Sequence, residues 1–359
     1  MVKQSAPMTV TPSLSGFQVE GCLLETSTCT IWRATQVALD RTILMLALKE
    51  EISASPPLRI AAFTSVRLLS KARSGLFPDI IDIFHKDGID YIILEDANST
   101  NILSLLNGQC LNPEQLFTLA IKLAESFSEL HASGLVYCSF SPARFFITED
   151  STPILPDITS LIQRGTTNTL SHIYRLTPAD LIWASPEQCD PNTPALDGRS
   201  DIFSVAMTLY ALATGEIPFG RLAPADILIA KQAHSIVSPC DIHPQFPIAL
   251  ATILSKMAHR DPALRYGSWD EVLVDLYQAQ QGFTPDFPDL EYSIIAPPKP
   301  KAQKQTRKPI RLSMRKLRAY QKLSKKKSIP MIFWVHLVAA ILTLLTLILI
   351  ALLLWKYNS

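Results

Sequence analysis

The strongest constraint on this 359-residue chain is a run without Asp, Glu, Lys or Arg at residues 331–355. The run is longer than the about 20 predominantly apolar residues that cross a bilayer as a helix. Thirteen Lys or Arg residues and no acid lie at 299–327, and basic residues beside a membrane helix stay on the cytoplasmic side. The pattern therefore predicts a transmembrane helix at 331–355, an extracytoplasmic tail at 356–359 and a cytosolic N-terminal part.

The formal net charge of +1 conceals a strong asymmetry along the chain. Removing the thirteen tail cations and Lys356 from the 33 cations leaves 19 against 32 acids, so residues 1–298 carry a net charge of −13. An acidic domain of this kind is not expected to bind nucleic acid. The basic linker is expected to lie on anionic lipid, so the membrane is a predicted partner. The six cysteines and seven histidines show no metal-ligand spacing, and no metal site is expected.

Hydrophobic periodicity predicts strands in the first third of the chain and helices afterwards. Continuous apolar runs at 43–48 and 91–94 are typical of buried strands. Apolar residues recurring at helical spacing, or apolar on every face, predict helices at 58–74, 113–134, 200–214 and 271–280. Strands followed by helices indicate an α+β fold.

Four short motifs follow one another over the second half of the chain. They are L-H-A-S-G-L-V at 130–136, S-P-E-Q at 185–188, S-D-I-F-S with T-G-E-I-P-F within 200–219, and D-P-A-L-R-Y at 261–266. Together they resemble the helical lobe of the eukaryotic-type Ser/Thr protein kinases that are common in bacteria. The resemblance implies a two-lobed protein-kinase-like fold, here followed by one transmembrane helix in the inner membrane of a bacterium.

The resemblance also implies a domain organisation. The predicted parts are an N-terminal segment at 1–14, a small β-rich lobe at 15–97, a larger helical lobe at 98–282, and a Pro-rich, basic juxtamembrane linker at 283–330. Glu187 and Arg265 map onto the family's buried ion pair, which holds the activation segment on the helical lobe. Asp201 maps onto the buried acid that steadies the backbone of the catalytic loop.

The residues with which the family binds ATP are largely replaced. The glycine positions of the phosphate-covering loop fall on Leu24, Thr26 and Cys29, whose side chains would keep the backbone from approaching a phosphate. The third-strand lysine position falls on Leu46, and no acid at residues 52–78 supplies its glutamate partner. Nucleotide affinity is expected to suffer.

Three further positions bear on nucleotide binding. Lys49 lies three residues beyond the lysine position and is the residue weighed as its replacement. The backbone of Glu95 and Ala97, in the predicted hinge between the lobes, could still meet an adenine. No cofactor is expected, and ATP with magnesium stays open as a weak ligand.

The catalytic loop departs further from the family pattern. H-R-D-x-K-P-x-N aligns with residues 137–144, which puts Ser139 at the proton acceptor, Ser141 at the lysine and Arg144 at the magnesium-binding Asn. A serine hydroxyl does not accept a proton unaided at neutral pH, and Arg144 is a fixed cation. Asp157 stands at the D-F-G aspartate and is the surviving candidate for a cofactor contact. Because the family's Asn and Asp side chains converge on magnesium, we expect an Arg144–Asp157 ion pair in the metal's place.

The favoured interpretation is a membrane-tethered pseudokinase, a regulatory scaffold that binds a protein partner and transfers little or no phosphoryl group. Three alternatives stay open: an active but atypical ATP-dependent Ser/Thr kinase, a structural component of a bacterial envelope assembly, and a phosphate reader that uses Arg144 or Arg164. Only four residues follow the membrane run, so any signal is expected from the cytosol or the membrane rather than from outside.

Overall fold

The structure is a computed structural model that describes residues 12–287, except 71, 73, 107, 167–175, 191, 194, 220–221 and 234–235. The chain divides into two compact units, residues 1–298 and 299–359, and the described residues all belong to the first. Most of the predicted basic linker and the predicted membrane helix lie outside the described residues. Within the described part, no helix is both long and apolar enough to span a bilayer.

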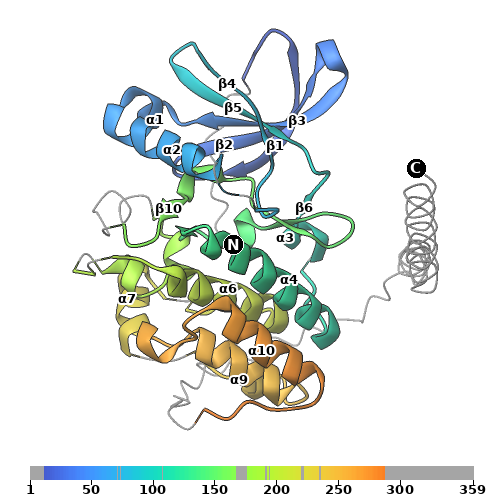
Figure 1. Ribbon diagram of the computed structural model, residues 1–359, viewed down its shortest axis with the longest axis vertical. Helices are drawn as coiled ribbons and strands as arrows, with labels where there is room; N and C mark the ends of the chain where they lie inside the picture. Colours follow the sequence, from blue (N-terminus) through green and yellow to red (C-terminus); the bar gives the residue numbers. More distant parts are fainter. Residues whose placement is uncertain are drawn as a thin grey trace, which may run out of the picture. The chain divides into compact units, whose positions relative to one another are not determined.

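The described residues form a small lobe built on a β-sheet and a larger helical lobe (Figure 1). The sheet is antiparallel, with strand order β1-β2-β3-β5-β4. Its strands are β1 (Phe17–Glu25), β2 (Cys29–Gln36), β3 (Arg41–Leu48), β4 (Ile80–Lys86) and β5 (Ile89–Glu95). Two helices, α1 (Glu50–Ala54) and α2 (Pro56–Leu69), connect β3 to β4. The strands predicted at 43–48 and 91–94 are thus β3 and β5.

Strand β3 shows how the sheet divides its apolar residues between two faces. Side chains alternate along a strand, so Ile43 and Met45 join one cluster on the sheet, whereas Leu44 and Leu46 join the other. The second cluster continues into the helical lobe and includes Leu155. The two lobes therefore share one hydrophobic core along the region between them.

The helical lobe is built around two long helices, α4 (Pro113–Ala132) and α6 (Gly198–Thr214). Helix α4 begins with a capping box in which Asn112 and Gln115 satisfy each other's backbone N–H groups. Helix α6 is buried on nearly all faces and ends at Gly215, whose φ of 71° is the left-handed conformation that glycine adopts easily.

Shorter helices complete this lobe: α3 (Ile102–Leu106), α7 (Pro224–Ala233), α8 (Pro239–Ile242), α9 (Ile248–Met257) and α10 (Trp269–Gln280). Short strands β6 (Thr100–Asn101), β8 (Phe146–Ile147) and β9 (Pro153–Ile154) form one small sheet, and β7 (Leu135–Val136) pairs with β10 (Ile162–Gln163). The helices predicted at 113–134, 200–214 and 271–280 are α4, α6 and α10. The helix predicted at 58–74 is α2, which starts two residues earlier because Pro56 fits the first turn of a helix, and ends five residues earlier.

Candidate functional site

The loop between β7 and β8 contains the residues aligned with the kinase catalytic loop, and α6 supports it from below. The Asp201 carboxylate is fully buried and accepts hydrogen bonds from the backbone N–H groups of Tyr137 (2.8 Å) and Cys138 (2.7 Å). His131 Nε2 lies 2.9 Å from the same carboxylate. Cys138 has a φ of 54°, an uncommon conformation for a residue with a side chain. The buried acid therefore holds a strained loop in place, at the position that the sequence assigned to it.

The segment after residue 176 is fixed to the helical lobe by Glu187 and Arg265. The guanidinium of Arg265 donates to both Glu187 oxygens, at 2.6 and 2.9 Å, and also to the His259 carbonyl at 2.6 Å. Burial raises the pKa of Glu187, but the hydrogen bonds and charge of Arg265 outweigh burial and hold that pKa below its usual value. Ser200 Oγ adds a hydrogen bond of 2.8 Å to Glu187. The structure thus brings together the pair that the motifs indicated.

Two anchors of the same segment escaped the sequence reasoning. Gln188 donates to the Cys138 carbonyl at 2.6 Å and accepts from the Ser185 N–H at 2.8 Å, so it ties the segment to the catalytic loop. Lys231 of α7 is buried and donates to the Ala184 carbonyl. Burial lowers the pKa of Lys231 to about 8. The S-P-E-Q motif contained Gln188, but nothing in the local sequence marks Lys231.

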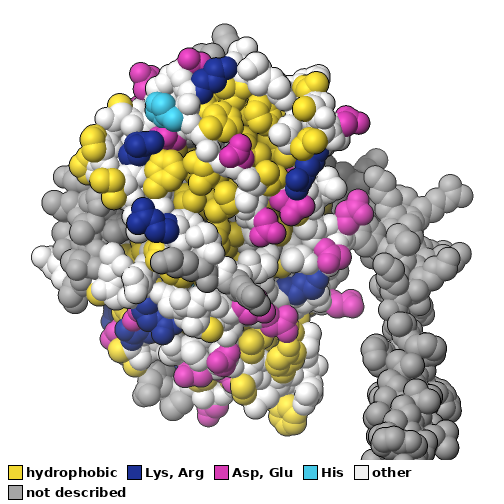
Figure 2. All heavy atoms as spheres, turned by 45° about the horizontal axis from the view of Figure 1, so that its top comes forward, with side chains coloured by type: hydrophobic (Ala, Val, Ile, Leu, Met, Phe, Trp, Pro, Cys, Tyr) yellow, Lys and Arg dark blue, Asp and Glu magenta, His cyan; other side chains and the backbone are white. Residues whose placement is uncertain are grey.

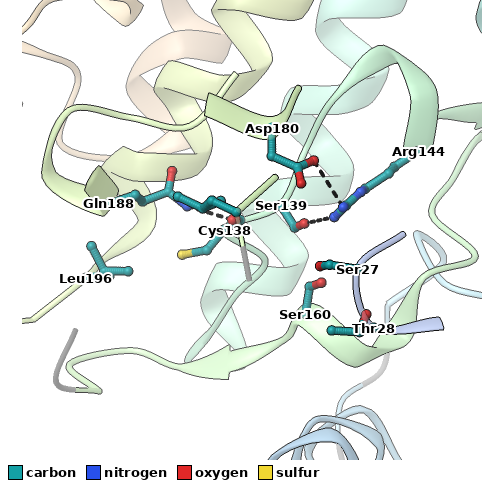
Figure 3. Close-up of a pocket in the computed structure, with 10 residues that line it drawn as sticks. Ser27, Thr28, Cys138, Ser139, Arg144, Ser160, Asp180, Gln188 and Leu196 are labelled. Atoms are coloured by element: carbon teal, nitrogen blue, oxygen red, sulfur yellow. Dashed lines mark hydrogen bonds and ion pairs between the residues drawn. The ribbon is translucent and has the colours of Figure 1, made fainter. Parts of the chain in front are cut away.

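Arg144 lies at the centre of a buried polar network between the lobes (Figure 3). Its Nη1 donates to Ser139 Oγ and lies 3.6 Å from Asp157 Oδ2, whereas its Nη2 lies 3.1 Å from Asp180 Oδ1. Burial lowers the pKa of Arg144, but the Asp157 and Asp180 carboxylates outweigh burial and raise it above its usual value. The guanidinium therefore stays charged between two carboxylates, which come from two segments that follow the loop.

Asp180 was not anticipated from the sequence. It accepts hydrogen bonds from the N–H and hydroxyl of Thr177, at 2.9 and 2.7 Å, which aim its carboxylate at Arg144. The expected partner Asp157 does lie beside Arg144, but Asp180 is closer. Because Asp180 lies 36 positions from Arg144, no local pattern connects the two residues.

Asp157 has further partners within the chain. Its Oδ1 accepts from the N–H and hydroxyl of Thr159, at 3.0 and 2.7 Å. The Cys29 thiol lies 3.7 Å away, and burial together with the charge of Asp157 raises the pKa of this thiol, so it stays neutral. The carboxylate is fully buried and its oxygens are engaged by protein groups.

The turn between β1 and β2 closes over this network. Thr28 Oγ1 lies 2.9 Å from Thr159 Oγ1, and Thr26 Oγ1 lies 3.1 Å from the Cys29 carbonyl. Leu24, Thr26 and Cys29, which stand at the glycine positions, are all buried. Side chains of the turn thus fill space that a phosphate chain would need. The cavity beside Ser27, Thr28, Ser139 and Arg144 measures about 40 Å³ (Figure 3), far below the about 300–1,000 Å³ of ligand pockets.

The residue at the family's lysine position, Leu46, is apolar, and Lys49, the candidate replacement, forms an ion pair outside the site. Leu46 is fully buried and lies opposite Ile31 of β2 and Ile92 of β5. Lys49 precedes α1 and donates to Glu25, at the far end of β1. Ser65 of α2 donates to the Thr159 and Leu161 carbonyls, at 3.1 and 2.6 Å, in the segment that follows Asp157.

The predicted hinge residues, Ser141 and Arg164 all make contacts within the protein. Glu95 is exposed, lies 3.4 Å from Arg41 and donates its N–H to the Asp79 carbonyl, whereas Ala97 packs on the hydrophobic core. Ser141 is buried, and its carbonyl accepts the Arg144 N–H at 3.0 Å. Arg164, the second arginine considered for a phosphate, donates to the His131 carbonyl at 2.9 Å.

The residues of this site do not fit ATP with magnesium. In the family, an Asn carboxamide and an Asp carboxylate bind the metal. Here Arg144 stands at the Asn position, and Asp157, at the Asp position, is hydrogen-bonded within the protein. Magnesium takes oxygen ligands in a nearly octahedral arrangement. The Arg144 guanidinium, 3.6 Å from the Asp157 carboxylate, would repel a magnesium ion at this place. Among the described residues, no group of three or more His, Cys, Asp or Glu could hold a metal ion.

Comparisons with known proteins agree with the fold. No protein-family model matches the chain. It is 21% identical over 261 residues to a probable serine/threonine-protein kinase of Clostridium perfringens, which covers 72% of this chain and 38% of that protein. A probable serine/threonine-protein kinase of Clostridium acetobutylicum is 22% identical over 273 residues, 76% of this chain and 40% of that protein. The chain thus spans less than half the length of these relatives.

Solved structures give the same result. The PknI kinase domain of Mycobacterium tuberculosis superimposes with TM-scores of 0.57 for a double mutant and 0.54 for another crystal structure, at 15% and 16% identity. Each match covers 76% of this chain and 99% of the PknI domain. The described part therefore has the two-lobed protein-kinase fold, as predicted. In sequence the chain is similar to proteins named as probable bacterial serine/threonine-protein kinases.

Proposed function

We propose that this protein is a pseudokinase, a kinase-fold module that binds protein partners and does not transfer phosphoryl groups. The observation that carries this proposal is Arg144, buried between Asp157 and Asp180 where the family binds magnesium. Phosphoryl transfer depends on metal ions and positioned charges rather than on covalent chemistry by the protein. A site that has an internal cation, no lysine at Leu46 and no carboxylate at Ser139 lacks the groups that stabilise the transition state.

The internal ion network also explains how the module keeps its shape without a nucleotide. Arg144 links the catalytic loop, the Asp157 segment and the Asp180 segment, which a bound metal and nucleotide would otherwise bridge. Thr28 and Ser65 add contacts from the small lobe to the segment at 159–161. We infer that the two lobes stay closed on each other, so that the module presents a constant surface to its partners.

The sequence supports a membrane tether for this module. The apolar run at 331–355 and the basic residues at 299–327 predict a single-pass protein whose kinase-fold part faces the cytosol. Membrane fractionation with alkaline washing, followed by protease treatment of spheroplasts, tests this arrangement. Retention in the pellet with the kinase-fold part protected from external protease is expected, and release by the wash would exclude the tether.

The function is tested with the full chain in detergent, by thermal unfolding with and without ATP and magnesium. Wild type should show no shift in Tm and no ATP turnover. Replacing both family positions in Arg144→Asn/Leu46→Lys should increase magnesium-dependent nucleotide binding if the guanidinium blocks the metal. Metal-dependent turnover by wild type, lost in Asp157→Asn, would instead favour the atypical active kinase, the alternative that the kinase relatives support.

A further inference from the structure

A large groove lies between α2 and β4, away from the site between the lobes. Its volume is about 1170 Å³. Its lining residues are Ser53, Pro56, Arg59, Ile60, Phe63, Val66, Arg67, Ser70, Ile80, Ile83 and His85. Ile60 and Ile83 are exposed, so the groove is open to solvent. Figure 2 shows apolar side chains gathered across this lobe, with basic side chains beside them.

The charge of the groove is one-sided. Its lining contains two arginines and a histidine but no acid. Arg59 stacks over the Phe63 ring at 5.2 Å and pairs with Asp90, which also lies 2.9 Å from His85. Arg67, in the last turn of α2, has no charged or hydrogen-bonded side-chain partner among the described residues. The groove therefore offers apolar surface beside an available cation.

Strand β4 gives the groove a direction. It is an edge strand that pairs with β5 on one side, and within the described residues no strand pairs with its other side. An exposed edge can bind an extended segment through main-chain hydrogen bonds, while pockets select its side chains. Helix α2 has 14 residues and is about 21 Å long, which matches about six residues of extended chain.

We propose that this groove binds the segment 289–295 of a second copy of the chain. The segment reads D-L-E-Y-S-I-I and combines two acids with four large apolar residues, the composition that complements Arg67 and the apolar lining. Three residues separate it from the basic residues that start at Lys299. The inference rests on the proposed function, because it names the protein partner of the pseudokinase as another copy of itself.

The described chain before this segment ends beside α9 and α10, not beside the groove. Phe287 packs edge-on against Tyr266 at 5.9 Å, and the Lys256 ammonium lies 4.0 Å from its ring, which fixes residue 287 beside α9 and α10. The acid at 291 lies only four residues further, about 14 Å of extended chain. In Figure 1, α9 and α10 lie at the end of the helical lobe that is far from the small lobe, and α10 packs on α4. A second molecule is therefore the more direct source of the segment.

Binding at this groove would act on α2, the helix that also contacts the site between the lobes. Helix α2 forms one wall of the groove, and its Ser65 donates to the carbonyls at 159 and 161 beside Asp157. A segment seated against Phe63 and Val66 would hold α2 in this position. Self-association would thus reinforce the closed arrangement of the lobes.

The test measures binding of a fluorescein-labelled peptide of residues 288–297 to the full chain in detergent, by fluorescence anisotropy. Saturable binding is expected, weakened at least about fivefold by Arg67→Glu, because the substitution turns an attractive charge contact into a repulsive one. A peptide with Lys at 289 and 291 should show the reverse preference and bind the Arg67→Glu protein better than wild type. Arg41→Glu, an exposed arginine on β3, is the control and should bind like wild type.

Self-association is measured in the same detergent by sedimentation velocity. Wild type should associate with increasing concentration, Arg67→Glu should not, and Arg67→Glu with Asp289→Lys and Glu291→Lys should associate again. Ile60→Ser, at a highly exposed position, should weaken association without unfolding the protein. Peptide binding that is equal in wild type and Arg67→Glu, or absent from both, would overturn the proposal.

Nucleotide binding is measured on the same preparations, which separates this proposal from the pseudokinase proposal. If ATP is turned over and charge reversal still switches peptide preference, the groove proposal stands and the pseudokinase proposal fails. If ATP does not bind and the peptide does not bind, the groove proposal fails alone.

Discussion

Replacing Arg144 by Met should destabilise the protein strongly, because it leaves two acids facing each other without a cation. Arg144 lies 3.6 Å from Asp157 and 3.1 Å from Asp180. At an effective dielectric constant of about 20, each contact is worth about 5 kcal/mol before desolvation. Most of this attraction is offset by burial of the ions. Removing one partner of a buried ion pair costs about 3–5 kcal/mol, since an uncompensated charge remains.

The assay is thermal and urea unfolding of the full chain in detergent, followed by circular dichroism. A loss of about 3–5 kcal/mol corresponds to a fall in Tm of about 6–20 °C for a domain of this size. The variant Arg144→Met/Asp157→Asn/Asp180→Asn should recover most of the lost stability, because replacing a whole buried ion cluster is often nearly neutral. Arg41→Ala removes an exposed pair with Glu95 and should cost no more than about 1 kcal/mol.

Two outcomes of these unfolding measurements would contradict the prediction for Arg144→Met. If Arg144→Met unfolds within about 1 kcal/mol of wild type, then the guanidinium is not a required internal cation. If the triple variant is less stable than the single variant, the cost arises from lost packing of the long side chain and not from unpaired acids. Either result would remove the physical basis for a metal substitute at this position.

Three further predictions concern the framework around the site. Arg265→Ala should lower the free energy of unfolding by about 3–5 kcal/mol at neutral pH, as measured by urea unfolding. Because the folded pKa of Glu187 is depressed, the difference from wild type should shrink as the pH falls below about 4.5. Lys231→Met should gain stability relative to wild type below pH 8. This relative gain should fall as the pH rises from 8 to 10.5, because the folded wild-type lysine has then lost its proton while the unfolded one still holds it; an unchanging difference would contradict burial as the cause. Asp201→Asn should cost about 1–3 kcal/mol, because an amide cannot accept from both N–H groups and His131, and hydrogen exchange at Tyr137 and Cys138 should accelerate.

Much of the framework could be predicted because it is encoded in short stretches of chain. The apolar spacing of α4, the continuous apolar character of α6 and the glycine that ends it are local signals, and the structure has these elements. Glu187 pairs with Arg265, and Asp201 accepts hydrogen bonds from the catalytic-loop backbone, which are the contacts that the resemblance implied. The expected neighbours Arg144 and Asp157 also meet, because the chain between them folds back through the paired strands β8 and β9.

Other parts of the site depend on contacts that no local spacing encodes. Thr28 meets Thr159 across 131 positions, and Ser65 meets Leu161 across 96. Asp180, the closer acid of Arg144, belongs to a segment whose path is set by anchors on α6 and α7. Sequence alone predicted the two lobes, the replaced residues at the family's catalytic positions and the apolar run at 331–355, because periodicity and residue identity carry these signals. Only the tertiary packing decided that polar side chains from separate segments fill the site. Arg144, Asp157 and Asp180 meet within the helical lobe, and Thr28 reaches Thr159 because the small lobe packs against it.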